Sequence, residues 1–143
     1  ILHFQIYSSI TFKITLMQSS NQLAIFMDNA AAHIMELNQG KITNKTIDSK
    51  FTHQMREEAL SKSENVMHEK EQQHQAAYYD ALANVIKDYS NVLIFGPTNA
   101  KLELHNILKE DKHFDAIKIE IKSSDKMNTA QQEAFVKDHF KVK

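Results

Sequence analysis

The residue types best suited to chemistry gather at one turn, where the only proline and one of the two glycines follow an apolar run. The four apolar residues 92–95 are typical of a buried strand, which Gly96 and Pro97 would end. Thr98 or Asn99 can then cap a helix over residues 100–109. A strand, turn and helix start directs backbone N–H groups to one point, where α/β proteins commonly bind ligands.

Two interpretations of this turn remain open. The helix-terminal N–H groups can hold a phosphate, with Lys101 adding positive charge, or the segment can serve only as turn and cap. It is not a Walker phosphate-binding loop, because the spacing and the second glycine are missing. The candidate binding residues here are Gly96, Pro97, Thr98, Asn99 and Lys101.

The acidic and histidine residues form no compact metal or nuclease motif. Asp28 could be the first acid of a two-metal nuclease, but the apolar run 92–95 ends in Gly96 instead of a second acid. We therefore expect Asp28 to be a turn residue. His68 and His74 are six positions apart and fall on different helix faces, and His33 could belong to the core or bind a ligand. We predict no metal site and no cofactor.

Two further regions could contact RNA or another partner. Residues 52–75 mix basic, acidic and glutamine side chains without glycine or proline, which fits either a solvated helix or loop or an adaptable interaction arm. Lys118 and Lys122 form a basic stripe that Glu120 dilutes, so it is either a phosphate-binding or a solvated face. The candidate residues in the first region are Arg56, Lys62, Gln72 and Gln73.

Size and composition predict one α/β domain. The chain has 143 residues, 42% of them hydrophobic, and 17 basic against 18 acidic side chains give a net charge of -1. Such a charge excludes a global field that attracts nucleic acid or membranes. The absence of cysteine excludes disulfides and thiol chemistry and fits a cytoplasmic protein.

The N-terminal residues 1–20 differ in composition from the rest of the chain. They are expected to be an extension outside the domain at 21–143. We expect the native start at Met17, with the preceding residues a translated upstream segment. The alternative is an additional edge strand or a partner-binding arm. Frequent polar residues make a secretory signal or a transmembrane helix a poor fit, so no membrane partner is expected.

Hydrophobic periodicity predicts the remaining elements. Strands are expected over 23–28, 31–37 and 42–51, with a turn at 38–40, and the apolar spacing of 76–89 predicts a helix over 69–89. Ile117, Ile119 and Ile121 alternate with charged residues in a further strand. A last helix would be capped by Asn128 or Thr129, with the capping box completed by Gln131 or Gln132. This order predicts a mixed five-stranded sheet, made of a three-strand meander and two crossovers, with helices on its faces.

That element order is the ribonuclease-H-like arrangement, and the sequence also resembles a translation family. LAIFMDNAAAHIMEL (23–37), the polar stretch 50–79, VLIFGPTNAKLELHNIL (92–108) and IKIEIKSSDKMNTAQQEAFVKDHF (117–140) carry the resemblance. They are similar to small bacterial and archaeal relatives of the middle domain of eukaryotic-type peptide-chain release factors and Pelota, the translational machinery component-like proteins.

The resemblance implies a fold and a partner class, but its hydrolytic motif is missing. In release factors the loop after the third strand carries a Gly-Gly-Gln motif that positions water on the peptidyl-tRNA ester. The matching region 52–75 contains no glycine, and Gln72 with Gln73 cannot replace the backbone freedom of that motif. Peptidyl-tRNA hydrolysis is therefore not expected here.

Three functional hypotheses follow. The first is a non-enzymatic, cytoplasmic translation-associated protein that binds the ribosome or tRNA-like RNA through residues 52–75 and the Gly96 turn. The second is a hydrolase of a phosphate or acyl ester at that turn, with Asp28, Thr98 and Lys101 as its polar groups. The third is a homo-oligomeric interaction module that does not bind RNA.

Overall fold

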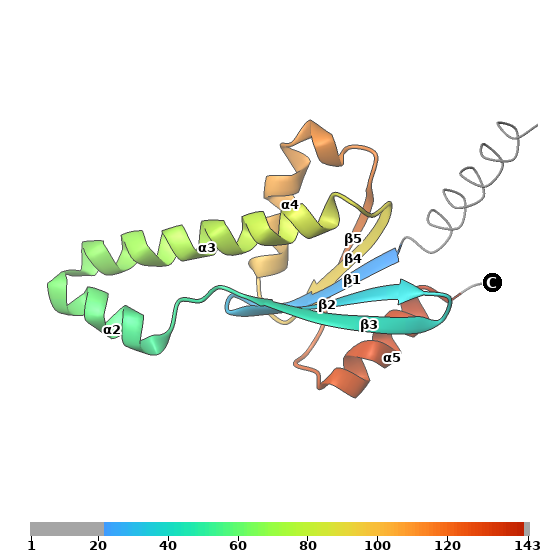
Figure 1. The fold of residues 1–143 in the computed structure, drawn as a ribbon, viewed down its shortest axis with the longest axis horizontal. Helices are drawn as coiled ribbons and strands as arrows, with labels where there is room; N and C mark the ends of the chain where they lie inside the picture. Colours follow the sequence, from blue (N-terminus) through green and yellow to red (C-terminus); the bar gives the residue numbers. More distant parts are fainter. Residues whose placement is uncertain (1–21, 142–143) are drawn as a thin grey trace, which may run out of the picture.

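A mixed five-stranded sheet forms the centre of the fold. The structure is a computed structural model that describes residues 22–141, so the N-terminal extension lies outside the described residues. The strands are β1 (Gln22–Met27), β2 (Ala31–Asn38), β3 (Lys41–Asp48), β4 (Asn91–Gly96) and β5 (Lys118–Ser123). Their order across the sheet is β3-β2-β1-β4-β5 (Figure 1). The first three pair antiparallel, and β4 pairs parallel with both β1 and β5, which confirms the predicted meander followed by two crossovers.

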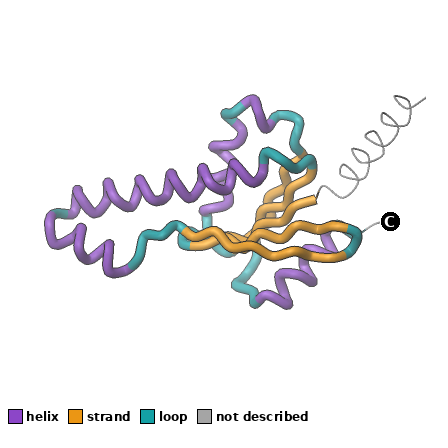
Figure 2. Tube along the Cα trace, viewed as in Figure 1, coloured by secondary structure: helices purple, strands orange, loops and turns teal. Residues whose placement is uncertain are grey.

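The described residues also form four helices, three of which pack on the faces of the sheet. They are α2 (His53–Lys62), α3 (Glu64–Ile86), α4 (Ala100–Lys109) and α5 (Thr129–His139), with a short 3-10 turn at Lys112–Phe114. α3 and α4 pack on one face and α5 packs on the other, as the ribbon and tube views show (Figures 1 and 2).

Alternation along β1 divides the core into two layers. Leu23, Ile25 and Met27 point to the α3/α4 side and belong to the buried cluster that contains Leu82. Ala24 points to the α5 side and belongs to the cluster that contains Val136. Because successive side chains of a strand point to opposite faces, this short apolar run serves both layers.

The turns of the meander use residues suited to them. Asp28 accepts hydrogen bonds from the backbone N–H groups of Ala30 (2.8 Å) and Ala31 (2.9 Å), so it closes the β1–β2 turn as expected. Gln39 (φ 53°) and Gly40 (φ 82°) form the β2–β3 turn in the left-handed region. β3 ends at Asp48, three residues before the predicted end at Phe51, and Lys50 beyond it has a positive φ of 60°.

The prediction of a helix over 69–89 is wrong at both ends, because α3 begins at Glu64 and ends at Ile86. The start is set by Ser63, whose extended backbone ends α2 and whose hydroxyl accepts the N–H of Val66 at 3.0 Å. Thr52 caps α2 in the same way, by accepting the N–H of Met55 at 3.2 Å. Residues 52–75 therefore form a helical hairpin, which extends clear of the sheet in Figure 1 and is called the arm below.

The C-terminal elements follow the prediction closely. α4 has the predicted bounds, and β5 begins and ends one residue later than the alternating segment 117–122 that predicted it. Asn128 caps α5, and the side chain of Gln131 accepts the N–H of Asn128, which completes a capping box. Gln132, the other candidate for the box, instead lies buried against β2.

Candidate functional site

The Gly96 turn packs tightly against the neighbouring strand. Gly96 has a φ of 155°, and a Cβ at this position would lie 2.0 Å from the carbonyl oxygen of Met27. Glycine is therefore required where β4 leaves the sheet beside the end of β1. The hydroxyl of Thr98 accepts the N–H of Ala100 at 3.2 Å, whereas Asn99 stands at the N-cap without a side-chain hydrogen bond.

Lys101 does not present its charge to solvent at this turn. Its side chain is only 4% exposed, and its ammonium group donates to the carbonyl oxygen of Thr98. Glu103 adds a carboxylate to the first turn of α4 and accepts a hydrogen bond from the hydroxyl of Tyr79 at 2.5 Å. The N-terminus of α4 thus already has a carboxylate of this chain nearby, and Pro97 beside it is half-buried.

Asp28 and His33 are both engaged in holding the fold together. The carboxylate of Asp28 is held by the turn amides described above, and its carbonyl oxygen accepts the hydroxyl of Tyr78 at 2.9 Å. The Nδ1–H of His33 donates to the side-chain oxygen of Gln132, which ties β2 to α5. Within residues 22–141, histidine and carboxylate side chains form no group of three or more that could hold a metal ion.

Buried tyrosines act as hydrogen-bond donors around this framework. Burial raises the pKa of Tyr78 and of Tyr79 well above the usual range for a phenol. Burial, followed by the hydrogen bond to Glu36, raises the pKa of Tyr89 to about 12. These hydroxyls therefore stay protonated at neutral pH and donate to the protein groups that face them.

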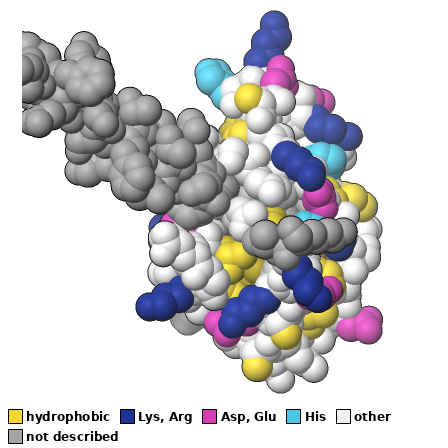
Figure 3. Space-filling view, turned by 90° about the vertical axis from the view of Figure 1, so that its right-hand side faces the viewer, with side chains coloured by type: hydrophobic (Ala, Val, Ile, Leu, Met, Phe, Trp, Pro, Cys, Tyr) yellow, Lys and Arg dark blue, Asp and Glu magenta, His cyan; other side chains and the backbone are white. Residues whose placement is uncertain are grey.

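The basic stripe on β5 contacts α5 and its own acidic neighbour. Lys118 lies 3.2 Å from the carboxylate of Glu120, which also lies 3.1 Å from Nε2 of His139. The ammonium group of Lys122 lies over the ring of Phe135, 5.7 Å from its centroid. On the face shown in Figure 3, basic side chains lie among acidic ones and do not form a single patch.

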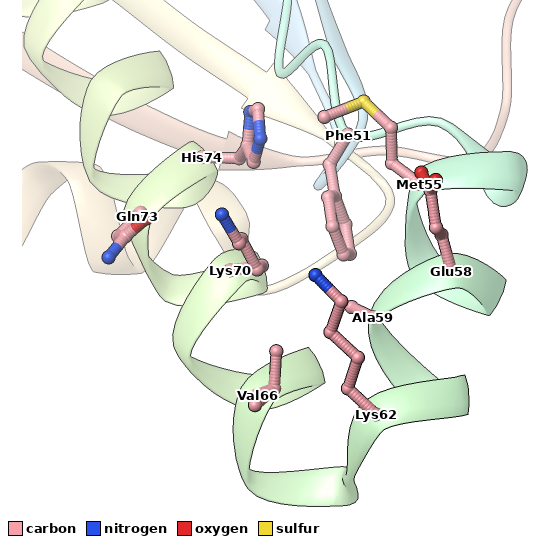
Figure 4. A pocket seen from close by; sticks show the side chains of 9 residues that line it. All are labelled: Phe51, Met55, Glu58, Ala59, Lys62, Val66, Lys70, Gln73 and His74. Carbon is pink, nitrogen blue, oxygen red and sulfur yellow. The ribbon is translucent and has the colours of Figure 1, made fainter.

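A pocket opens between α2 and α3 along the arm (Figure 4), with a volume of about 280 Å³. Two lysines, one from each helix, line it, and an aromatic residue from the β3–α2 connection forms part of its wall. The lining residues that matter most here are Phe51, Met55, Glu58, Lys62, Lys70 and His74. We call this cavity the arm pocket.

Local contacts hold the walls of the arm pocket in place. The ring of Phe51 stacks on His74 with centroids 5.2 Å apart and an interplanar angle of 30°. Nδ1 of His74 lies 3.2 Å from the carbonyl oxygen of Ser49, so this nitrogen carries the proton that is donated. Arg56 on α2 bonds Glu71 on α3 at 2.5 Å, which links the two helices of the hairpin.

The structure separates the residues predicted to bind. Lys62 and Gln73 line the arm pocket, Arg56 is paired with Glu71, and Gln72 is exposed without lining the pocket. The Gly96 turn lies elsewhere, and Lys118 and Lys122 lie on β5, at the opposite sheet edge from β3, which leads into the arm. Sequence reasoning missed Phe51, Lys70 and His74 as site residues, although the i, i+4 spacing of the last two places them on one helix face.

Structural comparison shows a release-factor-like fold. The chain aligns with Pelota from Thermoplasma acidophilum with a TM-score of 0.52 and 17% identity, covering 80% of this chain and 31% of that one. Pelota from Archaeoglobus fulgidus aligns with a TM-score of 0.50 and 13% identity, covering 93% of this chain and 36% of that one. An archaeal translation termination factor aligns with a TM-score of 0.50 and 16% identity, covering 92% of this chain and 38% of that one.

These matches cover roughly a third of the length of the proteins compared. No protein-family model matches the sequence, and no curated protein matches it. At such low identity the likeness shows the fold, and it confirms the fold implied by the sequence resemblance. Within residues 22–141, none of the helices has both the length and the apolar character needed to cross a membrane.

Proposed function

We propose that this chain is a non-enzymatic, cytoplasmic translation-associated protein that binds the ribosome or tRNA-like RNA through the arm. The fold supports this proposal, because one of the similar structures is a translation termination factor. In the family that the sequence resembles, the segment after the third strand carries the hydrolytic motif. In this chain the same segment is a glycine-free helical hairpin, so a binding role without Gly-Gly-Gln hydrolysis suits it better.

The observation that carries the proposal is the exposed position of the arm. α2 packs against α3, and most side chains of 52–75 are exposed to solvent. α3 has 23 residues and is therefore about 35 Å long, so its N-terminal half extends the arm well beyond the sheet. We assign the main contact to the arm and not to the Gly96 turn, because Lys101 at that turn is buried.

Charge indicates how this contact would work. Residues 52–75 contain three basic residues, Arg56, Lys62 and Lys70, against five glutamates. A segment with more acidic than basic residues does not follow a phosphate backbone through a general field. Binding would therefore rely on a few placed side chains, and its affinity would depend only weakly on salt.

A sucrose gradient of lysate from the protein's own host tests this proposal. The full chain is compared with a variant in which residues 52–68 are replaced by a short Gly-Ser linker, each at low and near-physiological salt. We expect the full chain to migrate with ribosomal particles or tRNA at both salts and the variant to stay at the top. Circular dichroism would first show that the variant retains its sheet.

Either of two results would contradict the proposal. The full chain could remain at the top of the gradient at both salts, or the linker variant could migrate with the particles as well as the full chain does. A Lys87→Ala/Lys109→Ala variant is the matched control for lost positive charge, because both lysines are exposed and lie outside the arm. It is expected to migrate like the full chain.

A further inference from the structure

The arm pocket combines features suited to one nucleotide. We propose, on the basis of the function proposed above, that it binds a single nucleotide of single-stranded RNA, with the phosphate between Lys62 and Lys70 and the base against Phe51 and Met55. The proposal rests on the two lysines that line the cavity, on the half-buried aromatic ring in its wall and on the size of the cavity.

The two lysines are available to an anion. Lys62 comes from α2 and Lys70 from α3, and both line the cavity between the helices. In Figure 4 the amino group of Lys62 points into this space, whereas that of Lys70 lies over α3 on the side of His74. Among the described residues, neither lies within ion-pair distance of a carboxylate, whereas Arg56 nearby is paired with Glu71. A phosphate between two ammonium groups would form charge-assisted hydrogen bonds with both walls.

Phe51 and Met55 provide the apolar side of the site. Phe51 is half-buried, with its ring stacked on His74, so its orientation is set before any ligand binds. Base stacking on aromatic rings is tolerant of sequence, because every base has a π-face. The thioether of Met55 adds a soft apolar contact. We therefore expect affinity for nucleotides with little preference among the four bases.

Size and charge limit the ligand to one unpaired nucleotide. The cavity of about 280 Å³ is just below the usual volumes of ligand pockets, which run from about 300 to 1,000 Å³. A base can enter a pocket of this kind only when it is free of a duplex stack. Glu58 also lines the cavity and opposes a second phosphate. The single-stranded loops and ends of RNA therefore fit better than a duplex does.

The test uses the full chain and defined probes. Amide and side-chain NMR shifts are followed on addition of uridine 5′-monophosphate, uridine or inorganic phosphate, and fluorescence anisotropy measures affinity for hexauridylate. We expect shifts at Phe51, Lys62, Lys70 and His74 with the nucleotide, weaker ones with phosphate and the weakest with uridine. The slope of log affinity against log salt should be close to −0.7, the value for about one phosphate contact to a single strand.

Variants separate the contributions. Lys62→Ala/Lys70→Ala should weaken hexauridylate binding at least tenfold and remove the salt slope, while Lys87→Ala/Lys109→Ala leaves both unchanged. Phe51→Leu keeps apolar bulk and should lose the stacking contribution, roughly 5- to 140-fold. Glu58→Gln removes the opposing charge and should tighten binding about two- to fivefold, a gain that a destabilised protein would not show.

The outcomes separate this inference from the proposed function. Hexauridylate binding that is unchanged in Lys62→Ala/Lys70→Ala, or shifts confined to other elements, would overturn the pocket assignment while RNA binding stands. No response to any probe, with arm-dependent migration on ribosomal particles retained, would also overturn it and would point to a protein surface of the particle as the partner. Nucleotide binding in the pocket without ribosome or tRNA association would support the pocket and contradict the proposed function.

Discussion

Replacing Gly96 with alanine should be far more costly than the same change at Gly40, the other glycine of the chain. At Gly40 (φ 82°) an added Cβ meets nothing within 4 Å, so the cost is the backbone conformation alone, about 1–2 kcal/mol. At Gly96 the new Cβ would lie 2.0 Å from the carbonyl oxygen of Met27, and real Cβ contacts lie at 3.0 Å or more. β4 and β1 would therefore have to separate locally by about 1 Å.

The expected loss at Gly96 has two parts. Its φ of 155° costs a residue with a side chain about 1–3 kcal/mol, and overpacking between two mostly buried strands adds about 1–3 kcal/mol. Gly96→Ala should therefore lower the free energy of unfolding by about 2–6 kcal/mol.

Urea unfolding followed by circular dichroism, with similar slopes for the two variants, gives both values. A Gly96→Ala loss no larger than that of Gly40→Ala would refute the idea that the turn is held by close packing against β1.

Three other predictions concern the packing of the helices. Burial, together with the charges of Lys122 and Lys118, lowers the pKa of His139 below 6.5 despite the carboxylate of Glu120. The unfolded chain therefore binds more protons than the folded chain near pH 6. The free energy of unfolding should fall as the pH drops below about 6.5. Urea midpoints between pH 5 and 7.5 check this, and His139→Gln should flatten the curve. Asn128→Ala removes the α5 cap and should cost about 1 kcal/mol, measured by urea unfolding against the exposed control Thr129→Ala. Leu82→Ala leaves a cavity at a fully buried position between α3 and the sheet and should lower the free energy of unfolding by about 2–5 kcal/mol. The control Ala81→Gly should have a smaller effect, because it changes only the helix propensity of α3.

The sheet could be predicted because its strands carry local signals. The apolar run 92–95 with Gly96 and Pro97 marks both the end of β4 and the start of α4, and the alternation of Ile117, Ile119 and Ile121 marks β5. The arm could not be predicted in the same way. Only Ala59 and Met67 are buried within 52–75, so the segment has no apolar periodicity, and its helices are set instead by single hydroxyl caps at Thr52 and Ser63.

The candidate site was harder to predict because it depends on how the arm folds back on itself. Lys62 was predicted as a binding residue, but Lys70 lies at the same pocket only because α2 packs against α3. Phe51, which also lines the pocket, was expected to end a strand. The direction of a long side chain is equally a tertiary property. Lys101 could face solvent or turn inward, and its burial against the Thr98 carbonyl follows from packing that no local pattern specifies.

Ultraviolet crosslinking of the full chain in cells of its own host tests the central proposal most directly. RNA-linked peptides would be identified by mass spectrometry and the attached RNA by sequencing. We predict ribosomal RNA or tRNA linked to a peptide from residues 51–75, with Phe51 as the leading attachment point. Recovery of no RNA, or of RNA linked only to peptides from β5 and α5, would contradict it.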